Sequence, residues 1–431
     1  MSFRTRALPL TLLLTLALGP CAEGAWPVVI TVFDDPNLPV ESLGLAERNG
    51  EHWFVTEIWD AATSTGDVYV KRHIPGTGLT ARADIGDDPL GVRRLVSGSH
   101  ALPSIAIDTN TAANVSMKVD AVGYGPTIEN VAVNPVALTV VQNPPELIDD
   151  DAARTADRGR SWIAINEAMA DVWSCWTDHD GNDDVYCRGR DTGQANLAFT
   201  EPILPLATDP NVVEDHPTVA LQPSTSRRVV AYHTSTGIKV RLFDQSNVED
   251  LPNTVALGGT TNVDFPHLIE ADGVLHVVAV NKATNVLNYA TCAANCHQDA
   301  NWARETIDDT TAAGDGVAHP QVAVDESGHV FVAFQHTPAG GGASAERVKV
   351  TAKCAVNGWD DDGGELVDDT ADREQVGGNG GAKGLPAFVY DATNNRLGVT
   401  FVQAVNAADR IGRWARKDAT LAYSDICAGQ P

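Results

Sequence analysis

Short apolar runs separated by polar turns repeat along this chain, and the unit that they form returns roughly every 50 to 65 residues. Residues 319–334 show the unit clearly, with an alternating apolar run, a polar turn and a second apolar run. A period of two that is interrupted by turn residues predicts the two strands of a hairpin. A third alternating run follows each hairpin, and a fourth run that ends in acidic residues precedes the next hairpin.

Seven copies of this unit can be aligned, and four strands per copy are typical of β-propeller blades. We therefore predict an all-β fold, a single seven-bladed β-propeller over residues 25–431 with four antiparallel strands per blade. The expected blades cover residues 42–88, 100–151, 160–210, 216–260, 265–309, 319–369, and 385–427 together with 26–35.

The two ends of the chain are expected to share the last blade. The final copy supplies three strands, the third at 420–427, and has no fourth. Residues 26–35 are similar to 301–309, with Trp26 in the place of Trp302, so we expect the N-terminal strand to complete the blade. A ring closed in this way leaves only the short outer edge of each blade exposed.

A proline opens the first strand in five of the copies. Proline has no backbone N–H to donate, so it is tolerated where a strand has not yet begun to pair. We therefore expect these prolines at the mouth of each first strand, and they are Pro103, Pro217, Pro266, Pro320 and Pro386.

The first 24 residues have the pattern of a signal peptide. Two arginines precede an apolar run at 8–18 that is too short to span a membrane, and small residues lead to a cleavage site after Gly24. Cys21 offers an alternative, because the sequence LGPC resembles a bacterial lipobox, in which the cysteine is lipidated. We expect a secreted or periplasmic protein, with lipid anchoring to the outer surface as the alternative. No other segment has the length of a membrane span.

The chain is strongly acidic, with a formal net charge of −27. Nucleic-acid binding draws its affinity from clustered Lys and Arg, so nucleic acid is not expected as a partner. A glycan, a protein partner or a cation remains compatible with this charge. The hydrophobic fraction of 43% is that of a folded protein with a sizeable core.

Seven cysteines agree with export to an oxidising compartment. One pair flanks an acidic hairpin and another pair encloses a small loop, so both are expected to form disulfides. These pairs are Cys175–Cys187 and Cys292–Cys296.

The remaining three cysteines allow two pairing schemes. A bridge between Cys21 and Cys427 would fasten the ring closure and leave Cys354 unpaired. Removal of Cys21 with the leader would instead leave an even number of cysteines and allow Cys354 to pair with Cys427.

Histidines precede the strand-opening proline in two copies. The first strand of a propeller blade lines the central channel, so His216 and His319 are expected near its mouth. His100 lies shortly before a third such position. The three side chains are candidate ligand-binding residues for a metal or an anionic sugar. The alternative is that each hydrogen-bonds a neighbouring loop.

Acidic pairs follow the fourth strand in five copies, and the loops that carry them are expected on the upper face of the ring. Their mutual repulsion would be relieved by a bound cation, although acidic residues are also common turn formers. The residues are Asp34, Asp35, Asp87, Asp88, Asp149, Asp150, Asp308, Asp309, Asp368 and Asp369.

One acidic hairpin resembles a calcium loop. Asp178, Asp180, Asn182 and Asp184 alternate as the oxygen ligands of Ca²⁺ do. The glycine stands at 181 rather than after Asn182, and no Glu follows at the twelfth place. The alternative is a turn whose side chains hydrogen-bond their own backbone.

The segment TADRGRSW at 155–162 matches the Ser/Thr-x-Asp-x-Gly-x-x-Trp turn of Asp-box (BNR) repeats, and the chain thereby resembles the sialidase-like bacterial β-propellers. In that superfamily the turn lies between third and fourth strands, whereas Trp162 leads into an expected first strand. The resemblance implies six blades for a sialidase, together with an arginine cluster, an early Phe/Tyr-Arg-Ile-Pro motif and a Tyr nucleophile activated by Glu. The seventh blade and the lack of that motif after residue 24 count against sialidase activity.

The sequence favours a binding or interaction module over an enzyme, namely an exported propeller with an acidic upper face for a glycan or a cell-surface partner. It contains no HExxH zinc motif, nucleophile elbow, phosphate loop or dinucleotide fingerprint. The alternative is a carbohydrate-active enzyme, a sialidase-like glycosidase or a polysaccharide lyase, with its site at the channel mouth. The third hypothesis is a structural propeller stabilised by calcium.

Overall fold

A computed structural model gives the architecture between residues 26 and 428. The described residues are 26–35, 37–60, 65–85, 96–97, 103–107, 113–121, 125–134, 137–140, 146–149, 158–179, 183–192, 198–207, 212–250, 254–258, 262–307, 315–341, 345–355, 358–359, 364–368, 373–376, 387–405 and 409–428.

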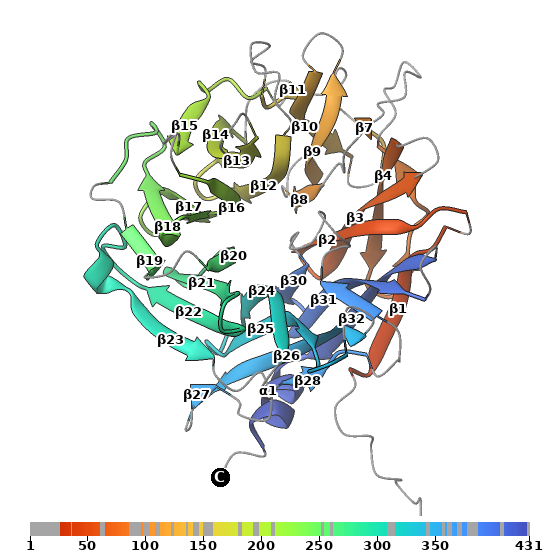
Figure 1. Ribbon diagram of the computed structural model, residues 1–431. Helices are drawn as coiled ribbons and strands as arrows, with labels where there is room; N and C mark the ends of the chain where they lie inside the picture. The colour runs from red at the N-terminus through yellow and green to blue at the C-terminus, as the bar shows by residue number, and fades with distance from the viewer. Residues whose placement is uncertain are drawn as a thin grey trace, which may run out of the picture.

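Seven antiparallel sheets form a ring, as Figure 1 shows. The predicted fold class, a seven-bladed β-propeller with four strands per blade, is confirmed. The first strand of each blade lies nearest the centre of the ring, and later strands follow outward. We call the end of the ring at which first strands begin the upper rim. The opposite end, where hairpins join first and second strands, is the lower rim.

The strands of the first four blades pair in sequence order, except that β6 and β7 of blade 1 both pair with β4. Blade 1 contains β2 (Val40–Arg48), β3 (Glu51–Asp60), β4 (Thr65–Ile74), β5 (Gly78–Leu79), β6 (Ala83–Asp84) and β7 (Val96–Ser97). Blade 2 contains β8 (Ser104–Ile107), β9 (Ala113–Ala121), β10 (Gly125–Val133) and β11 (Glu146–Leu147). Blade 3 contains β12 (Arg158–Asn166), β13 (Asp171–Asp178), β14 (Asp184–Asp191) and β15 (Leu204–Ala207). Blade 4 contains β16 (Glu214–Gln222), β17 (Arg227–Thr234), β18 (Gly237–Phe243) and β19 (Thr254–Gly258).

The last three blades follow the same plan. Blade 5 contains β20 (Val263–Ala271), β21 (Val274–Asn281), β22 (Val286–Cys292) and β23 (Ala303–Ile307), with the short helix η2 (Asp299–Asn301) before β23. Blade 6 contains β24 (Gly316–Val324), β25 (Val330–Thr337), β26 (Arg347–Cys354), β27 (Gly358–Trp359) and β28 (Glu365–Leu366). Blade 7 contains β29 (Arg373–Val376), β30 (Phe388–Asp391), β31 (Arg396–Ala404), β32 (Arg410–Asp418) and β1 (Val28–Phe33).

The N-terminal strand closes the ring, as expected. β1 pairs antiparallel with β32 and is the outermost strand of blade 7. Trp26 and Trp302, which the sequence places in equivalent positions, are both buried. Backbone hydrogen bonds between the two ends of the chain therefore hold the propeller shut.

The third strand of the last blade was predicted at 420–427, and this prediction is wrong. The strand is β32, which ends at Asp418, and the helix α1 (Ala419–Cys427) follows it. The Asp418 side chain accepts a hydrogen bond from the Leu421 N–H, so it caps the helix. Ala419, Ala422 and Ile426 bury one face of α1 in a cluster with side chains of blades 6 and 7.

Pro103 lies directly before β8, as predicted, and Pro386 lies outside the described residues. In blades 4 to 6 the prediction is wrong: the first strand begins three or four residues before its proline, and Pro217, Pro266 and Pro320 lie at β-bulges within it. A bulge leaves one residue unpaired, so the missing proline N–H costs no ladder hydrogen bond there.

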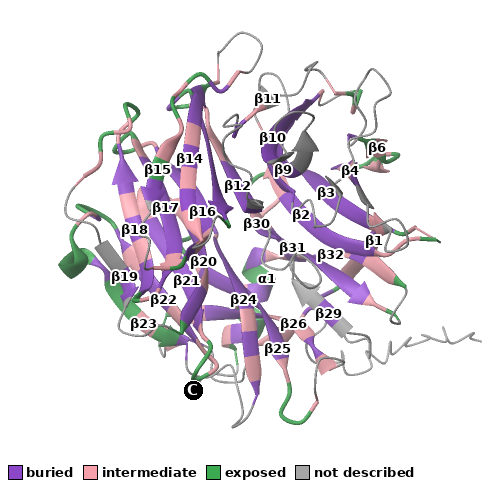
Figure 2. Ribbon diagram, turned by 45° about the horizontal axis from the view of Figure 1, so that its top comes forward, coloured by how far each residue is buried: buried purple, intermediate pink, exposed green. Residues whose placement is uncertain are grey.

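Apolar side chains of adjacent blades pack face to face to make the core. Figure 2 shows buried residues along the middle of most strands. Trp53, Trp173, Trp176 and Trp414 are fully buried. Each such ring removes on the order of 200 Å² from water, which corresponds to roughly 5 kcal/mol of transfer free energy as an upper bound. Packing between blades therefore dominates the stability of the ring.

Buried polar side chains join neighbouring first strands beneath the upper rim. The side-chain oxygen Oε1 of Gln321 accepts from the Ala387 N–H at 2.7 Å, and His267 Nδ1 accepts from the Val322 N–H at 3.1 Å. Each contact links one blade to the next. These hydrogen bonds fix the angular spacing of the strands that carry the candidate site.

Three disulfides are present, and they include both pairs expected from the sequence, Cys175–Cys187 and Cys292–Cys296. The third joins Cys354 at the end of β26 to Cys427 in α1. This is the scheme that leaves Cys21 out, and Cys21 itself lies outside the described residues. Within the described part of the chain no helix is long and apolar enough to cross a membrane.

Candidate functional site

Three neighbouring blades carry a strained residue at the same place on the upper rim. His216, Phe265 and His319 stand before the bulge prolines and have φ values of 50°, 52° and 50°. Such backbone favours glycine, and a bulky residue there costs about 1 kcal/mol or more. Strain repeated at equivalent positions persists only where the surroundings enforce it, and it concentrates at functional sites.

The side chains of these three residues contact one another. The ring centroids of His216 and Phe265 are 4.6 Å apart, and those of Phe265 and His319 are 4.3 Å apart. The Lys282 ammonium lies 5.6 Å from the Phe265 ring centroid. The bulges of blades 4, 5 and 6 thus build one continuous aromatic row.

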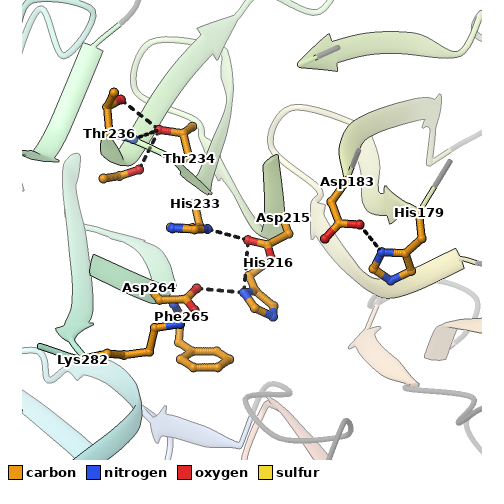
Figure 3. A network of polar contacts seen from close by, with 11 residues as sticks. His179, Asp183, Asp215, His216, His233, Thr234, Thr236, Asp264, Phe265 and Lys282 are labelled. Carbon is orange, nitrogen blue, oxygen red and sulfur yellow. Dashed lines mark hydrogen bonds and ion pairs between the residues drawn. The ribbon is translucent and has the colours of Figure 1, made fainter. Parts of the chain in front are cut away.

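A network of charged groups adjoins this row, as Figure 3 shows. His216 Nδ1 donates to Asp264 Oδ1 in the next blade at 2.8 Å, and Asp215 Oδ1 lies 3.3 Å from the same nitrogen. His233 Nδ1 lies 2.8 Å from Asp215 Oδ1, and Lys282 Nζ donates to Asp264 Oδ2 at 2.6 Å. Each carboxylate therefore has two cationic or donor partners.

The network fixes the protonation of its members. Burial alone would lower the pKa of His216, but its hydrogen bonds to Asp215 and Asp264 outweigh burial and raise the pKa to about 9. Burial alone would raise the pKa of each aspartate. Hydrogen bonds from His216 and His233 lower the pKa of Asp215, and those from His216 and Lys282 lower that of Asp264. At neutral pH an imidazolium thus lies between two carboxylates.

Buried basic groups surround the network from blades 3 and 5. Burial lowers the pKa of Arg160 to about 10, although the charges of Asp264 and Asp215 act in the opposite direction. Burial and the charge of Arg160 lower the pKa of His267 to about 3, so this imidazole is neutral. Arg160 is therefore the buried cation that acts on the two carboxylates.

Asp215, His216 and Asp264 are also the group of described residues that offers ligand atoms for a metal, all within 4.8 Å of one another. A cation would have to displace the proton of His216. Two carboxylates and an imidazole suit Zn²⁺ or Mn²⁺ better than Ca²⁺, which prefers oxygen ligands alone. The imidazolium already supplies the positive charge that a metal would bring.

Two of the three predicted histidines meet in this site. His216 and His319 both contact Phe265, whereas His100 lies outside the described residues. The sequence reasoning missed Asp215, Asp264 and Phe265. A signal was present, because an aspartate stands two places before the proline in both Asp-His-Pro and Asp-Phe-Pro.

The structure describes two of the four residues that were predicted to bind Ca²⁺. Asp178 and Asp184 pair across the end of β13 and β14, and Asp178 is buried. Asp180 and Asn182 lie outside the described residues, so Ca²⁺ binding by this hairpin stays a prediction. His179 Nδ1 and Asp183 Oδ1 are 2.5 Å apart beside the same turn (Figure 3).

The acidic pairs do not form an exposed ring in the part of the chain that the structure describes. Asp149 and Asp368 are buried, and Asp35 accepts from Arg82 at 2.8 Å, while Asp34 is exposed. Two of the four described members are thus buried, and the acidic upper face as a whole stays a prediction. The other members of the set lie outside the described residues: Asp87, Asp88, Asp150, Asp308, Asp309 and Asp369.

No family model matches this chain, and no curated protein matches it either. Solved structures that it resembles include an α-L-arabinanase from Penicillium chrysogenum, at 12% identity over 76% of this chain and 98% of that one, with a TM-score of 0.47. A GH93 α-L-arabinofuranosidase from Fusarium graminearum is 11% identical over 75% of this chain and 96% of that one, with a TM-score of 0.48. The NanB sialidase from Streptococcus pneumoniae is 11% identical over 94% of this chain and 72% of that one, with a TM-score of 0.45.

Proposed function

We propose that this chain is an exported propeller that binds a carbohydrate at the upper rim. The observation that carries the proposal is the pair of ionised carboxylates, Asp215 and Asp264, beside the Phe265 ring on strained bulges. Carboxylates accept strong hydrogen bonds from hydroxyl groups, and an aromatic ring offers an apolar surface for the C–H face of a sugar. Sugars present both kinds of surface.

Binding is favoured over hydrolysis by the charges of the site. Glycoside hydrolysis by two carboxyl groups needs one of them protonated, with a raised pKa, to act as general acid. The pKa values of Asp215 and Asp264 are both lowered. His216 holds its proton between them with a pKa of about 9, which makes it a weak acid. The described site thus has no strong general acid.

Export is supported by the disulfides. Three pairs of cysteines form bonds, and such bonds persist in oxidising compartments. The predicted signal peptide, or the lipobox at Cys21, would deliver the chain to such a compartment. An exported protein would encounter carbohydrates of the cell surface and its surroundings, and these are the ligands that we propose.

A glycan array probed with residues 25–431 tests the proposal. The wild type is expected to retain at least one glycan, and D264N and F265A are expected to bind it at least about tenfold more weakly. D183N is the matched control, because Asp183 pairs with a histidine at the same rim and is away from Phe265. Failure of the wild type to retain any glycan, or equal retention by F265A, would rule the proposal out.

Glycoside hydrolysis at the same site is the second candidate function. The observation in its favour is that ligand atoms of Asp215 and Asp264 lie within 4.8 Å, near the separation of about 5 Å used by retaining glycosidases. A panel of glycosides and polysaccharides tests it. Turnover by the wild type that falls at least about a thousandfold in both D215N and D264N would establish hydrolysis, whereas no turnover on any substrate would leave binding alone.

A further inference from the structure

A second polar cavity lies on the lower rim, between the first and last blades. Its volume is about 280 Å³, and it is lined by the β2–β3 and β30–β31 hairpins together with the ends of β4 and β32. Figure 1 shows these strands side by side where the ring closes. The cavity is thus at the opposite end of the ring from the Asp215–His216–Asp264 network.

The most buried ring in the cavity has unpaired nitrogens. His52 is 2% exposed, and within the described part of the chain neither of its ring nitrogens has a hydrogen-bond partner. The nearest carboxylate oxygen, Asp391 Oδ2, is 3.7 Å from Nε2, which is too far for a hydrogen bond. His73 Nδ1 is also buried without a partner. Folded proteins rarely leave such atoms unsatisfied, so these nitrogens indicate a missing ligand.

Two guanidinium groups give the cavity a positive charge. Arg396 and Arg416 both line it, and neither has an ion-pair partner among the described residues. The Arg416 guanidinium lies instead over the Trp414 ring, 5.0 Å from its centroid. Burial, together with the charge of Arg396, lowers the pKa of Arg416. Unpaired cations are notable in a chain whose net charge is −27.

The one carboxylate of the cavity is already engaged by its own hairpin. Asp391 accepts from the Asn394 N–H at 3.0 Å and from Asn394 Nδ2 at 2.8 Å. Burial lowers the pKa of His52 to about 4, so its imidazole is neutral and offers one donor and one acceptor. The cavity thus sets one carboxylate against two guanidinium groups, which leaves an excess of positive charge, and buried imidazole nitrogens without partners lie beside it.

A glycine lets the two hairpins meet. Gly50 has a φ of 80°, and a Cβ at this position would lie 2.6 Å from Asn394 Nδ2. A side chain here would be strained at this φ and would displace the Asn394 side chain, which holds Asp391. The close approach brings His52 and Arg396, from opposite ends of the chain, to one cavity.

We propose that this cavity is a binding site for a small anion, a carboxylate- or phosphate-bearing molecule of about monosaccharide size. The guanidinium groups of Arg396 and Arg416 hold the anionic group, because their planar donors match carboxylate and phosphate oxygens. The imidazoles of His52 and His73 hydrogen-bond the remainder of the molecule. The site is independent of the carbohydrate site on the upper rim.

Titration calorimetry with glucuronate, inorganic phosphate and glucose tests the proposal on the intact chain. Glucuronate is expected to bind and glucose, its neutral counterpart, is not. Binding of phosphate as well would show that the oxyanion suffices, whereas binding of glucuronate alone would show that the sugar body is also recognised. R396Q and R416Q are expected to weaken binding at least about tenfold. R227Q is the matched control, since Arg227 lies elsewhere on the lower rim and is paired with Asp250 at 2.7 Å.

A second measurement needs no variant. In a long-range ¹H–¹⁵N spectrum of the wild type, the ring nitrogens of His52 are expected to shift on addition of glucuronate. D183N, at the upper rim, is expected to bind the anion as the wild type does. The anion titration and the glycan array use different variants at opposite rims, so failure of the carbohydrate proposal leaves this one standing. The proposal is overturned if neither anion binds, if glucose binds equally, or if R396Q, R416Q and R227Q bind alike.

Discussion

His216 of blade 4 donates a hydrogen bond to Asp264 of blade 5 at 2.8 Å, and this contact joins two blades at the upper rim. The same imidazole lies 3.3 Å from Asp215, so one cation serves two carboxylates. A structural link between blades and a candidate ligand site are thus built from the same three side chains. Substitutions that separate these two roles are informative.

Replacing His216 with asparagine is expected to lower the free energy of unfolding by about 2 kcal/mol, because the two carboxylates would then lose the cation that lies between them. Asparagine tolerates positive φ, so H216N adds little backbone strain. Urea unfolding of H216N against H179N checks this. His179 belongs to an exposed ion pair whose loss is expected to cost less than about 1 kcal/mol. Equal midpoints for H216N and the wild type would contradict the expectation.

The stability of the protein is expected to depend on pH through the same network. Because the pKa of His216 is raised to about 9, its contribution is complete below about pH 6.5 and is lost as the pH rises toward 9. The pKa values of Asp215 and Asp264 are lowered, so their contribution is present above about pH 4 and is lost as the pH falls. Thermal melts from pH 4 to pH 10 should show that the alkaline loss is smaller in H216N. Parallel curves for the two proteins would argue against this assignment.

The disulfide Cys354–Cys427 is expected to stabilise the chain more than Cys292–Cys296 does. It closes a loop with a sequence separation of 73, against 4 for the other bond. Chain entropy then predicts losses of about 4 and 2 kcal/mol for the respective double alanine variants. Denaturant unfolding measures both. A peptide map under non-reducing conditions should link Cys354 to Cys427, and a bridged peptide that contains Cys21 would refute this pairing.

Ring closure by β1 is expected to be sensitive to charge on its buried face. Val32 is 1% exposed and packs in a cluster with Trp414 and Phe54, so V32D would bury an unpaired carboxylate and cost at least about 3 kcal/mol. T31D is the matched control on the same strand. Thr31 is exposed and its hydroxyl oxygen accepts from Arg413 at 2.6 Å, a contact that aspartate can keep. Thermal unfolding of both variants is the measurement, and V32D is expected to melt at a lower temperature than T31D. Equal melting temperatures for V32D and T31D would show that burial of β1 does not stabilise the ring.

The alternation of apolar and polar residues predicted the strands correctly, but it did not predict the helix α1. The third strands of blades 3, 4 and 5 lie where the alternation of apolar residues predicts them, as in β14, β18 and β22. Residues 420–427 form a helix instead, because a short apolar segment does not distinguish helix from strand. The Asp418 cap, the bond to Cys354 and burial against blades 6 and 7 decide the outcome.

By itself the sequence determined the number of blades, the closure of the ring and two disulfides. These features depend on a pattern that repeats within each blade or on cysteines close in sequence. Tertiary structure alone decided which side chains meet between blades. His216 and Asp264 are 48 residues apart, and His52 and Arg396 come from opposite ends of the chain. A local sequence pattern carries no information about contacts between residues so far apart along the chain. The shifted pKa values and the unpaired nitrogens arise only when ring closure and blade packing bring these groups together.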